Sequence, residues 1–136
     1  MIRYLENKPT PEEYNYLISS VGWGNLENNI IEEALKNTLY SLCVYDDEKL
    51  IGYGRIIGDN SIFLYIQSIM VVPEYQNKKI GTGIMENLLN KINEYKIKNP
   101  EVRVYLGASK GREEFYKRFG FVSRKDLDLG DGMILK

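Results

Sequence analysis

The chain has 136 residues with a formal net charge of −1, and 43% of its residues are hydrophobic. This composition fits one globular domain, residues 1–136, and it argues against a disordered chain or a dedicated nucleic-acid binder. The sequence has no histidine and one cysteine, Cys43, so Ser-His catalysis, Cys-His catalysis and an intrachain disulfide are excluded and no metal is expected. No apolar run is long enough to cross a bilayer and no signal-peptide pattern is present, so we expect a cytoplasmic protein that binds neither membrane nor nucleic acid.

The first third of the sequence predicts a short strand at residues 1–5, followed by two helices. Thr10 begins the first helix, because it offers a hydroxyl cap, Pro11 follows at the first helical position and Glu13 supplies a carboxylate at the third. A stripe of apolar residues with helical spacing predicts the second helix over residues 26–37.

The middle of the sequence predicts three strands joined by tight turns. Residues 40–45 and 50–57 flank a polar turn, so we expect them to form a hairpin. Residues 62–72 follow a second turn and are apolar on both faces, which is typical of a central strand. Pro73 should end this strand.

The last part of the sequence predicts a helix over residues 80–97, because its apolar residues recur every four positions. A strand at 102–107 would complete a strand-helix-strand unit, so this strand and the central one should be parallel. A helix over 112–119 and two final strands, at 121–122 and 133–135, follow. We therefore predict an α/β fold with a mixed sheet and the element order β-α-α-β-β-β-α-β-α-β-β.

The segment YQNKKIGTG, residues 75–83, joins the central strand to the helix that follows it. The first amides of a helix have no partners within the helix, the helix dipole places positive charge there, and glycine allows a close approach to the backbone. Such a junction can hold a phosphate or pyrophosphate, although a plain crossover turn has the same pattern. A P-loop is disfavoured because Gly-Lys-Ser/Thr is absent at the required spacing. A dinucleotide fingerprint is disfavoured because Glu86 stands where its third glycine belongs.

Two segments resemble the GCN5-related N-acetyltransferases, the GNAT family. VVPEYQNKKIGTG is similar to the family's acetyl-coenzyme A motif, Q/R-x-x-G-x-G/A, which follows V-x-P-x-Y at the end of a central strand. Gln76 and Gly81 match this motif, and Gly83 stands where alanine is common. Residues 114–121, EFYKRFGF, resemble the family's F-Y-x-x-x-G-F segment, and the predicted element order is similar across nearly the whole chain.

The resemblance implies acetyl-coenzyme A as a co-substrate, no metal, and a central strand splayed from strand 102–107. Tyr116 would be the general acid for the leaving thiolate. Tyr65 and Gln67 would hold water that carries a proton from the amine, and Trp23 would line the acceptor pocket or, alternatively, be a buried packing anchor. The implied cofactor-binding residues are Ile69, Met70, Val71, Gln76, Asn77, Lys78, Lys79, Ile80, Gly81, Thr82, Gly83 and Ser109.

Two positions depart from the family pattern. Lys79 replaces the first glycine of the motif, and we expect it to be tolerated, at some cost in cofactor affinity, if its backbone keeps helical angles rather than a positive φ. Ser109 stands where many members have asparagine, and its hydroxyl could still cap the last helix.

We expect an N-acetyltransferase that moves an acetyl group to a primary amine, of a small molecule or a protein, by direct attack in a ternary complex. The alternative is a non-catalytic acyl-coenzyme A sensor or interaction module of the same fold, which the departures and the lack of an evident base favour. A nucleotide-binding regulatory domain is a third, weaker alternative. The resemblance also implies a homodimer, but no motif identifies an interface or the acceptor.

Overall fold

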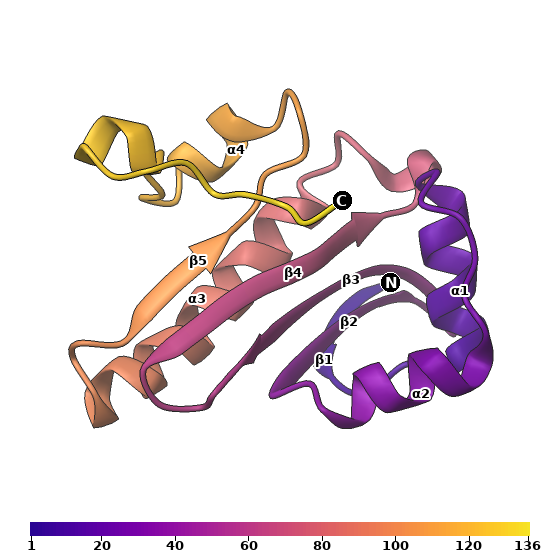
Figure 1. Cartoon of the computed structure of the whole chain (residues 1–136). Helices are drawn as coiled ribbons and strands as arrows, with labels where there is room; N and C mark the ends of the chain where they lie inside the picture. Colours follow the sequence, from indigo (N-terminus) through magenta and orange to yellow (C-terminus); the bar gives the residue numbers. More distant parts are fainter. The chain divides into compact units, whose positions relative to one another are not determined.

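The computed structural model describes residues 1–136, which form two compact units, Met1–Tyr105 and Leu106–Lys136 (Figure 1). The first contains β1 (Ile2–Glu6), α1 (Pro11–Ser20), α2 (Asn28–Lys36), β2 (Tyr40–Asp46), β3 (Lys49–Gly58), β4 (Phe63–Val71), η1 (Pro73–Tyr75), α3 (Ile80–Lys98) and most of β5 (Arg103–Leu106). The second contains α4 (Glu113–Lys117) and η2 (Arg124–Leu127).

The strands form a mixed sheet in the order β1-β2-β3-β4-β5. The first four strands pair antiparallel with their neighbours, and the arrows of β4 and β5 point the same way in Figure 1, which confirms the predicted mixed sheet. β5 lies beside the start of β4, where Arg103 N donates to Ile62 O at 2.9 Å and the rings of Phe63 and Tyr105 lie 4.9 Å apart. Both lie at the beginning of β4, so the splay of the strands further along stays a prediction.

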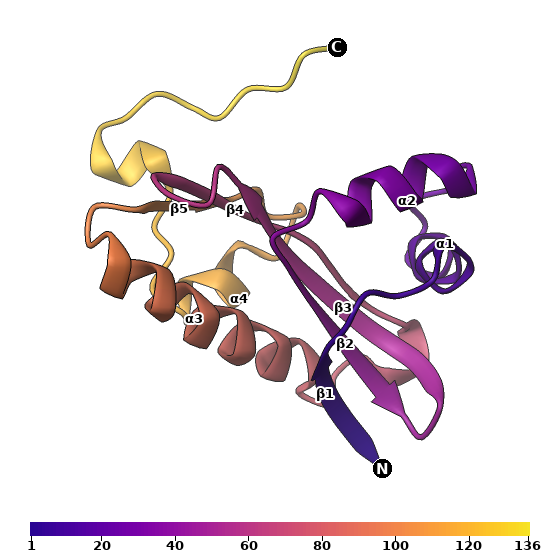
Figure 2. The same cartoon turned by 90° about the horizontal axis from the view of Figure 1, so that it is seen from below.

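Helices cover both faces of the sheet in the first unit. Figure 2 shows α3 against one face and α1 and α2 on the other. The apolar stripe of α3 is buried, as its spacing predicts, through Ile80, Ile84, Met85, Leu88 and Ile92. A Cβ atom at Gly54 would lie 2.7 Å from Cγ2 of Ile84 and 2.8 Å from Cδ1 of Ile69, so this glycine allows α3 to pack closely on β3.

The two N-terminal helices begin where specific side chains bind the backbone. The Thr10 hydroxyl accepts a hydrogen bond from Glu13 N at 3.1 Å and the Glu13 carboxylate accepts one from Thr10 N at 2.9 Å, which confirms the predicted capping box. α2 begins two residues later than expected. Asn15 binds both Leu26 N, at 2.9 Å, and Leu26 O, at 2.7 Å, so the backbone groups of Leu26 are used outside the helix.

The two final strands predicted at residues 121–122 and 133–135 are absent, and that part of the prediction is wrong. Within the second unit these residues belong to neither a helix nor a strand, and Met133, Ile134 and Leu135 are 93%, 88% and 99% exposed. Their apolar composition favours an extended backbone locally. A strand also needs a partner for its N–H and C=O groups, and these segments have none in a sheet.

Candidate active site

The chain turns sharply between β4 and α3. Tyr75 N donates to Val72 O at 2.9 Å, and Gln76 N donates to Pro73 O at 3.2 Å. The side chain of Gln76 reaches back, and its Nε2 donates to Val71 O at 2.9 Å. Gln76, predicted as a cofactor contact, therefore holds the loop against the end of the strand.

The backbone amides of residues 77–82 have no hydrogen-bond acceptor within the chain. The first bond of helical type runs from Gly83 N to Lys79 O at 3.1 Å. Asn77 and Lys79 have left-handed backbones, with φ of 63° and 64°, and loops with such residues form concavities that bind anions through successive amides. The start of α3 adds the positive end of the helix dipole, so this loop has the donors that a pyrophosphate requires.

Lys79 does not keep the helical angles expected of it. It is the N-cap of α3 with φ 64° and ψ 18°, the left-handed region that glycine enters freely and other residues enter at a cost. The amide is retained, but the lysine is strained where the motif has glycine. Gly83 has a different role: a Cβ atom there would lie 2.3 Å from the Tyr4 hydroxyl oxygen, so the helix start is fitted to β1.

The end of β4 contains a β-bulge. Gln67 pairs with Arg55 and Met70 pairs with Tyr53, so two residues of β4 stand opposite one residue of β3. Ser68, in the bulge, has φ 59°. Beyond it, Val72 N donates to Ile51 O at 2.9 Å, and residues alternate along a strand, so Ile69 and Val71 turn their backbone groups away from β3. Met70 turns its backbone N–H and C=O groups toward β3.

A hydrogen-bond network supports this bulge from the face covered by α1 and α2. The Gln67 carbonyl oxygen accepts hydrogen bonds from Arg55 Nε at 2.9 Å, Arg55 Nη2 at 2.7 Å and the Ser68 hydroxyl at 2.6 Å. The oxygen of Gln67 must face Arg55 because a guanidinium only donates. Since Ser68 donates its single proton to Gln67, the Tyr14 hydroxyl donates to Ser68, at 2.9 Å.

This network limits what Gln67 can do. Its Oε1 already accepts three hydrogen bonds and has no capacity for another. Gln67 can therefore offer a water or a substrate only the N–H donors of its Nε2. Tyr65 lies two residues earlier on the same face of β4, as predicted, and its hydroxyl makes no hydrogen bond within the chain. A proton relay through this face would therefore accept the proton at Tyr65 or at water, not at Gln67.

Tyr116 lies in α4 of the second unit. Its ring packs edge-on against Phe115, at 5.1 Å, and Phe121, at 6.4 Å between centroids. Burial raises the pKa of the Tyr116 hydroxyl, while Arg112 lowers it by a smaller amount, so the hydroxyl stays protonated at neutral pH. Ser109 precedes α4, but its hydroxyl does not cap this helix. The N-cap is Arg112, and no side-chain hydrogen bond caps the helix there.

The profile of the acetyltransferase (GNAT) domain family matches residues 18–135. The chain belongs to the GNAT family. It is 30% identical to the N-acetyltransferase ycf52 of Pyropia yezoensis over 125 residues, which cover 89% of this chain and 68% of that protein. A relative from Prochlorococcus marinus, named as ycf52-like, is also 30% identical, over 80% of this chain and 61% of its own length. The chain thus spans about two-thirds of these relatives.

A solved structure supports the same assignment. A probable acetyltransferase of unknown function from meticillin-resistant Staphylococcus aureus superposes with a TM-score of 0.87 and 32% identity, and the match covers 100% of this chain and 99% of that one. The fold class and the membership predicted from the two motifs are thereby confirmed. Membership of the GNAT family indicates that the protein is an acetyltransferase.

Trp23 is not a buried packing anchor in this GNAT protein. Its side chain is 50% exposed, in a loop whose flanking glycines, Gly22 and Gly24, have φ of 81° and 89°. Leu26 and Ile30, further along the same segment, are also exposed. The structure leaves Trp23 available to a ligand, and a place in the acceptor pocket stays a prediction.

Cys43 is fully buried in β2, and this burial raises the pKa of its thiol to about 12. Its Sγ donates to Asn7 O at 3.0 Å. A thiol with this pKa does not form a thiolate near neutral pH, so Cys43 is an inert core residue.

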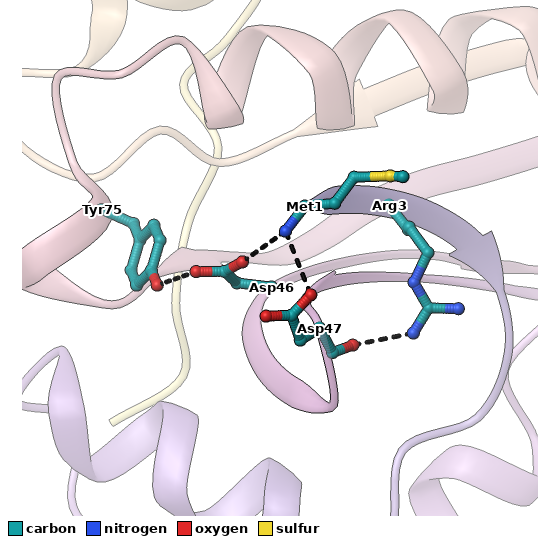
Figure 3. Close-up of polar contacts among 5 residues, drawn as sticks. All are labelled: Met1, Arg3, Asp46, Asp47 and Tyr75. Atoms are coloured by element: carbon teal, nitrogen blue, oxygen red, sulfur yellow. Dashed lines mark hydrogen bonds and ion pairs between the residues drawn. The ribbon is translucent and has the colours of Figure 1, made fainter.

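A polar cluster ties the loop after β4 to the β2–β3 turn (Figure 3). The Tyr75 hydroxyl donates to the Asp46 carboxylate, which also accepts from the Met1 ammonium at 3.0 Å. Asp47 contacts the same ammonium at 3.1 Å, and Arg3 donates to Asp47 O at 2.8 Å. The bond from Tyr75, and then the ammonium, lower the pKa of Asp46, and the same bond raises the pKa of Tyr75.

Sequence reasoning missed the residues that support the site, namely Tyr14, Asp46, Arg55 and Ser68. The signal for two of them is a polar residue inside an apolar strand: Arg55 in LIGYGRII and Ser68 in LYIQSIMV. Asp46 and Tyr14 carry no such signal.

None of the helices combines the length and apolar composition needed to cross a membrane.

Proposed function

We propose that this GNAT protein is an N-acetyltransferase that uses acetyl-coenzyme A as its acetyl donor and a primary amine as its acceptor. The observation that carries the proposal is the loop after β4, where the amides of residues 77–82 have no acceptor in the chain and lie at the start of α3. A pyrophosphate supplies the anionic oxygens that such amides lack.

The donor would lie along β4 and the loop. Ile69 and Val71 turn their backbone groups to the edge away from β3, where an extended pantetheine arm can pair as an added strand. Gln76 occupies the Val71 carbonyl, which leaves the Val71 amide as a donor. An amide in this position can polarise the thioester carbonyl and stabilise the oxyanion that forms on it.

The reaction would be a direct transfer. The amine nitrogen attacks the thioester carbonyl carbon, the C–S bond breaks, and the thiolate takes a proton from Tyr116. The amine loses a proton to water near Tyr65, and Gln67 positions that water through its N–H groups. The raised pKa of Cys43 supports this route over transfer through a cysteine.

A thiol-release assay with acetyl-coenzyme A over a panel of small amines and lysine peptides tests this function, alongside calorimetric titration of acetyl-coenzyme A. Binding together with thiol release on at least one amine supports the proposal. Binding without release on any amine would favour the acyl-coenzyme A sensor instead, and no binding would reject both. The cytoplasmic location and the homodimer stay predictions, which fractionation and light scattering can check.

A further inference from the structure

Arg55 is a cation on the sheet that no carboxylate neutralises. It lies partly buried near the middle of β3, in an otherwise apolar stretch. The ion pairs of the protein involve Met1 with Asp46 and Asp47, Lys91 with Glu94, and Lys117 with Glu114, and none of them includes Arg55. Its partners are neutral: the Gln67 carbonyl oxygen, and the Thr38 hydroxyl at 3.0 Å from Nη1.

The group around Arg55 presents donors only. A guanidinium has five N–H donors, and three of them are used in these bonds, so two remain without an acceptor in the chain. The Gln67 oxygen is fully occupied, which leaves its Nε2 donors free, as shown above. The Thr38 hydroxyl donates its proton to Ala34 O at 2.8 Å. A ligand that satisfies these groups must accept hydrogen bonds and carry negative charge.

The position of Arg55 relates this group to the proposed reaction. Arg55 pairs with Gln67, which directly precedes the bulge and the end of β4 along which the donor would lie. Arg55 lies on the sheet face of Tyr53, whose ring meets Tyr14 of α1 edge-on at 5.6 Å, so it faces the side of α1 and α2 and not that of α3 (Figure 2). Trp23 is exposed in the loop between the same two helices.

We propose that Arg55 binds an anionic group on the acceptor, so that the preferred acceptor is a primary amine that also carries a carboxylate or phosphate. This inference rests on the proposed function. Arg55 determines specificity here, and the amine itself reacts further along β4. A planar guanidinium with free donors suits either oxyanion.

The test compares matched amines in the thiol-release assay. 6-Aminohexanoate and O-phosphoethanolamine carry the anion, and 6-aminohexanamide and ethanolamine are their neutral counterparts. We expect kcat/KM at least tenfold higher for the anionic member of at least one pair. Arg55→Gln should remove that preference, because kcat/KM should fall at least about tenfold further for the anionic amine than for its neutral counterpart, mainly through KM. Arg55→Lys should restore part of it, and Arg103→Gln, at an exposed arginine of β5, should leave it intact.

Equal kcat/KM within both pairs would overturn the inference, as would an equal loss for both members in Arg55→Gln. If Arg55→Gln does not fold, inorganic phosphate at saturating acetyl-coenzyme A should still compete with the anionic amine in the unaltered protein and not with ethanolamine, and equal inhibition of both would reject the site. If no amine is acetylated, calorimetry of 6-aminohexanoate and 6-aminohexanamide with the coenzyme A-loaded protein decides. Anion-selective binding then supports the site although the enzyme proposal fails, and binding without selectivity, or none, rejects it.

Discussion

Lys79 replaces a glycine of the GNAT motif, and its backbone is strained. Its left-handed backbone costs a residue with a Cβ atom about 1–2 kcal/mol. We predict that Lys79→Gly stabilises the protein by up to about 1 kcal/mol, since part of the relief is lost to the greater freedom of glycine in the unfolded chain. Urea unfolding followed by tyrosine fluorescence measures the change.

Lys79→Ala is the matched control for this variant. It removes the same charge and keeps the Cβ atom, so its free energy of unfolding should stay below that of Lys79→Gly. Calorimetry of acetyl-coenzyme A with both variants separates the charge from the backbone, because each retains the amide. Equal stability of the two variants would show that the left-handed angle carries no cost.

Tyr116 is the proposed general acid for the leaving thiolate. Burial raises the pKa of its hydroxyl, so a proton is available throughout pH 6–9. We predict that Tyr116→Phe lowers kcat at least about tenfold, within the range that general acids usually contribute. Turnover measured across pH 6–9 tests this, with Tyr16→Phe, at an exposed tyrosine of α1, as control. A variant with unchanged turnover at every pH would remove Tyr116 as the acid.

Individual residues differ in how far the sequence predicts them. The loop of free amides after β4 could be predicted from the pattern of residues 75–83, because its donors are backbone N–H groups, which every residue except proline has. The role of Gln67 could not, since its free atoms depend on Arg55 from β3 and Ser68 from the bulge. The angle of Lys79 could not either, because lysine favours no left-handed conformation of its own.

At the scale of elements, the packing of β1 on α3 depends on Gly83. A Cβ atom there would lie 2.3 Å from the hydroxyl oxygen and 2.5 Å from Cζ of Tyr4, closer than any normal contact. We predict that Gly83→Ala destabilises the protein by about 1–3 kcal/mol, the usual cost of overpacking, although alanine is common at this position of the motif. Chemical denaturation gives the value.

A double-mutant cycle with Tyr4→Ala identifies the cause of that loss. In the Tyr4→Ala background the collision is absent, and Gly83→Ala should be neutral or stabilising, because alanine is the better helix former. If Gly83→Ala costs the same in both backgrounds, the contact with Tyr4 is not the reason for the glycine.

Elements with strong local signals were predicted well. The proline and capping residues set the start of α1, and the four-residue spacing of apolar side chains set α3. The start of α2 was shifted by a tertiary contact, because Asn15 of α1 binds the backbone of Leu26. The prediction of the last two strands failed for a related reason. A strand forms only beside a partner strand, and the sequence of residues 121–122 and 133–135 does not indicate that partner.

At the scale of the whole molecule, two turns that hold the sheet depend on ionised carboxylates. The Asp59 carboxylate accepts hydrogen bonds from the amides of Ser61, Ile62 and Phe63, at 2.9, 2.8 and 3.0 Å, in the β3–β4 connection. The bond from Phe63 is the largest cause that lowers the pKa of Asp59, followed by that from Ser61. Asp46, which holds the loop after β4 through Tyr75, also has a lowered pKa.

A carboxyl whose pKa is lowered by folding stabilises the protein above its unfolded pKa of about 3.9, and this contribution is lost as the pH falls through the folded value. We therefore predict that the melting temperature falls as the pH drops below about 4. Asp59→Asn and Asp46→Asn should each be less stable than the unaltered protein at pH 7, and the difference should shrink below pH 4, because the native carboxyl is then protonated. Thermal unfolding at a series of pH values checks this, with Glu48→Gln, at an exposed turn residue, as control. A difference that stays constant from pH 7 to pH 3 would mean that ionisation of these groups does not stabilise the turns.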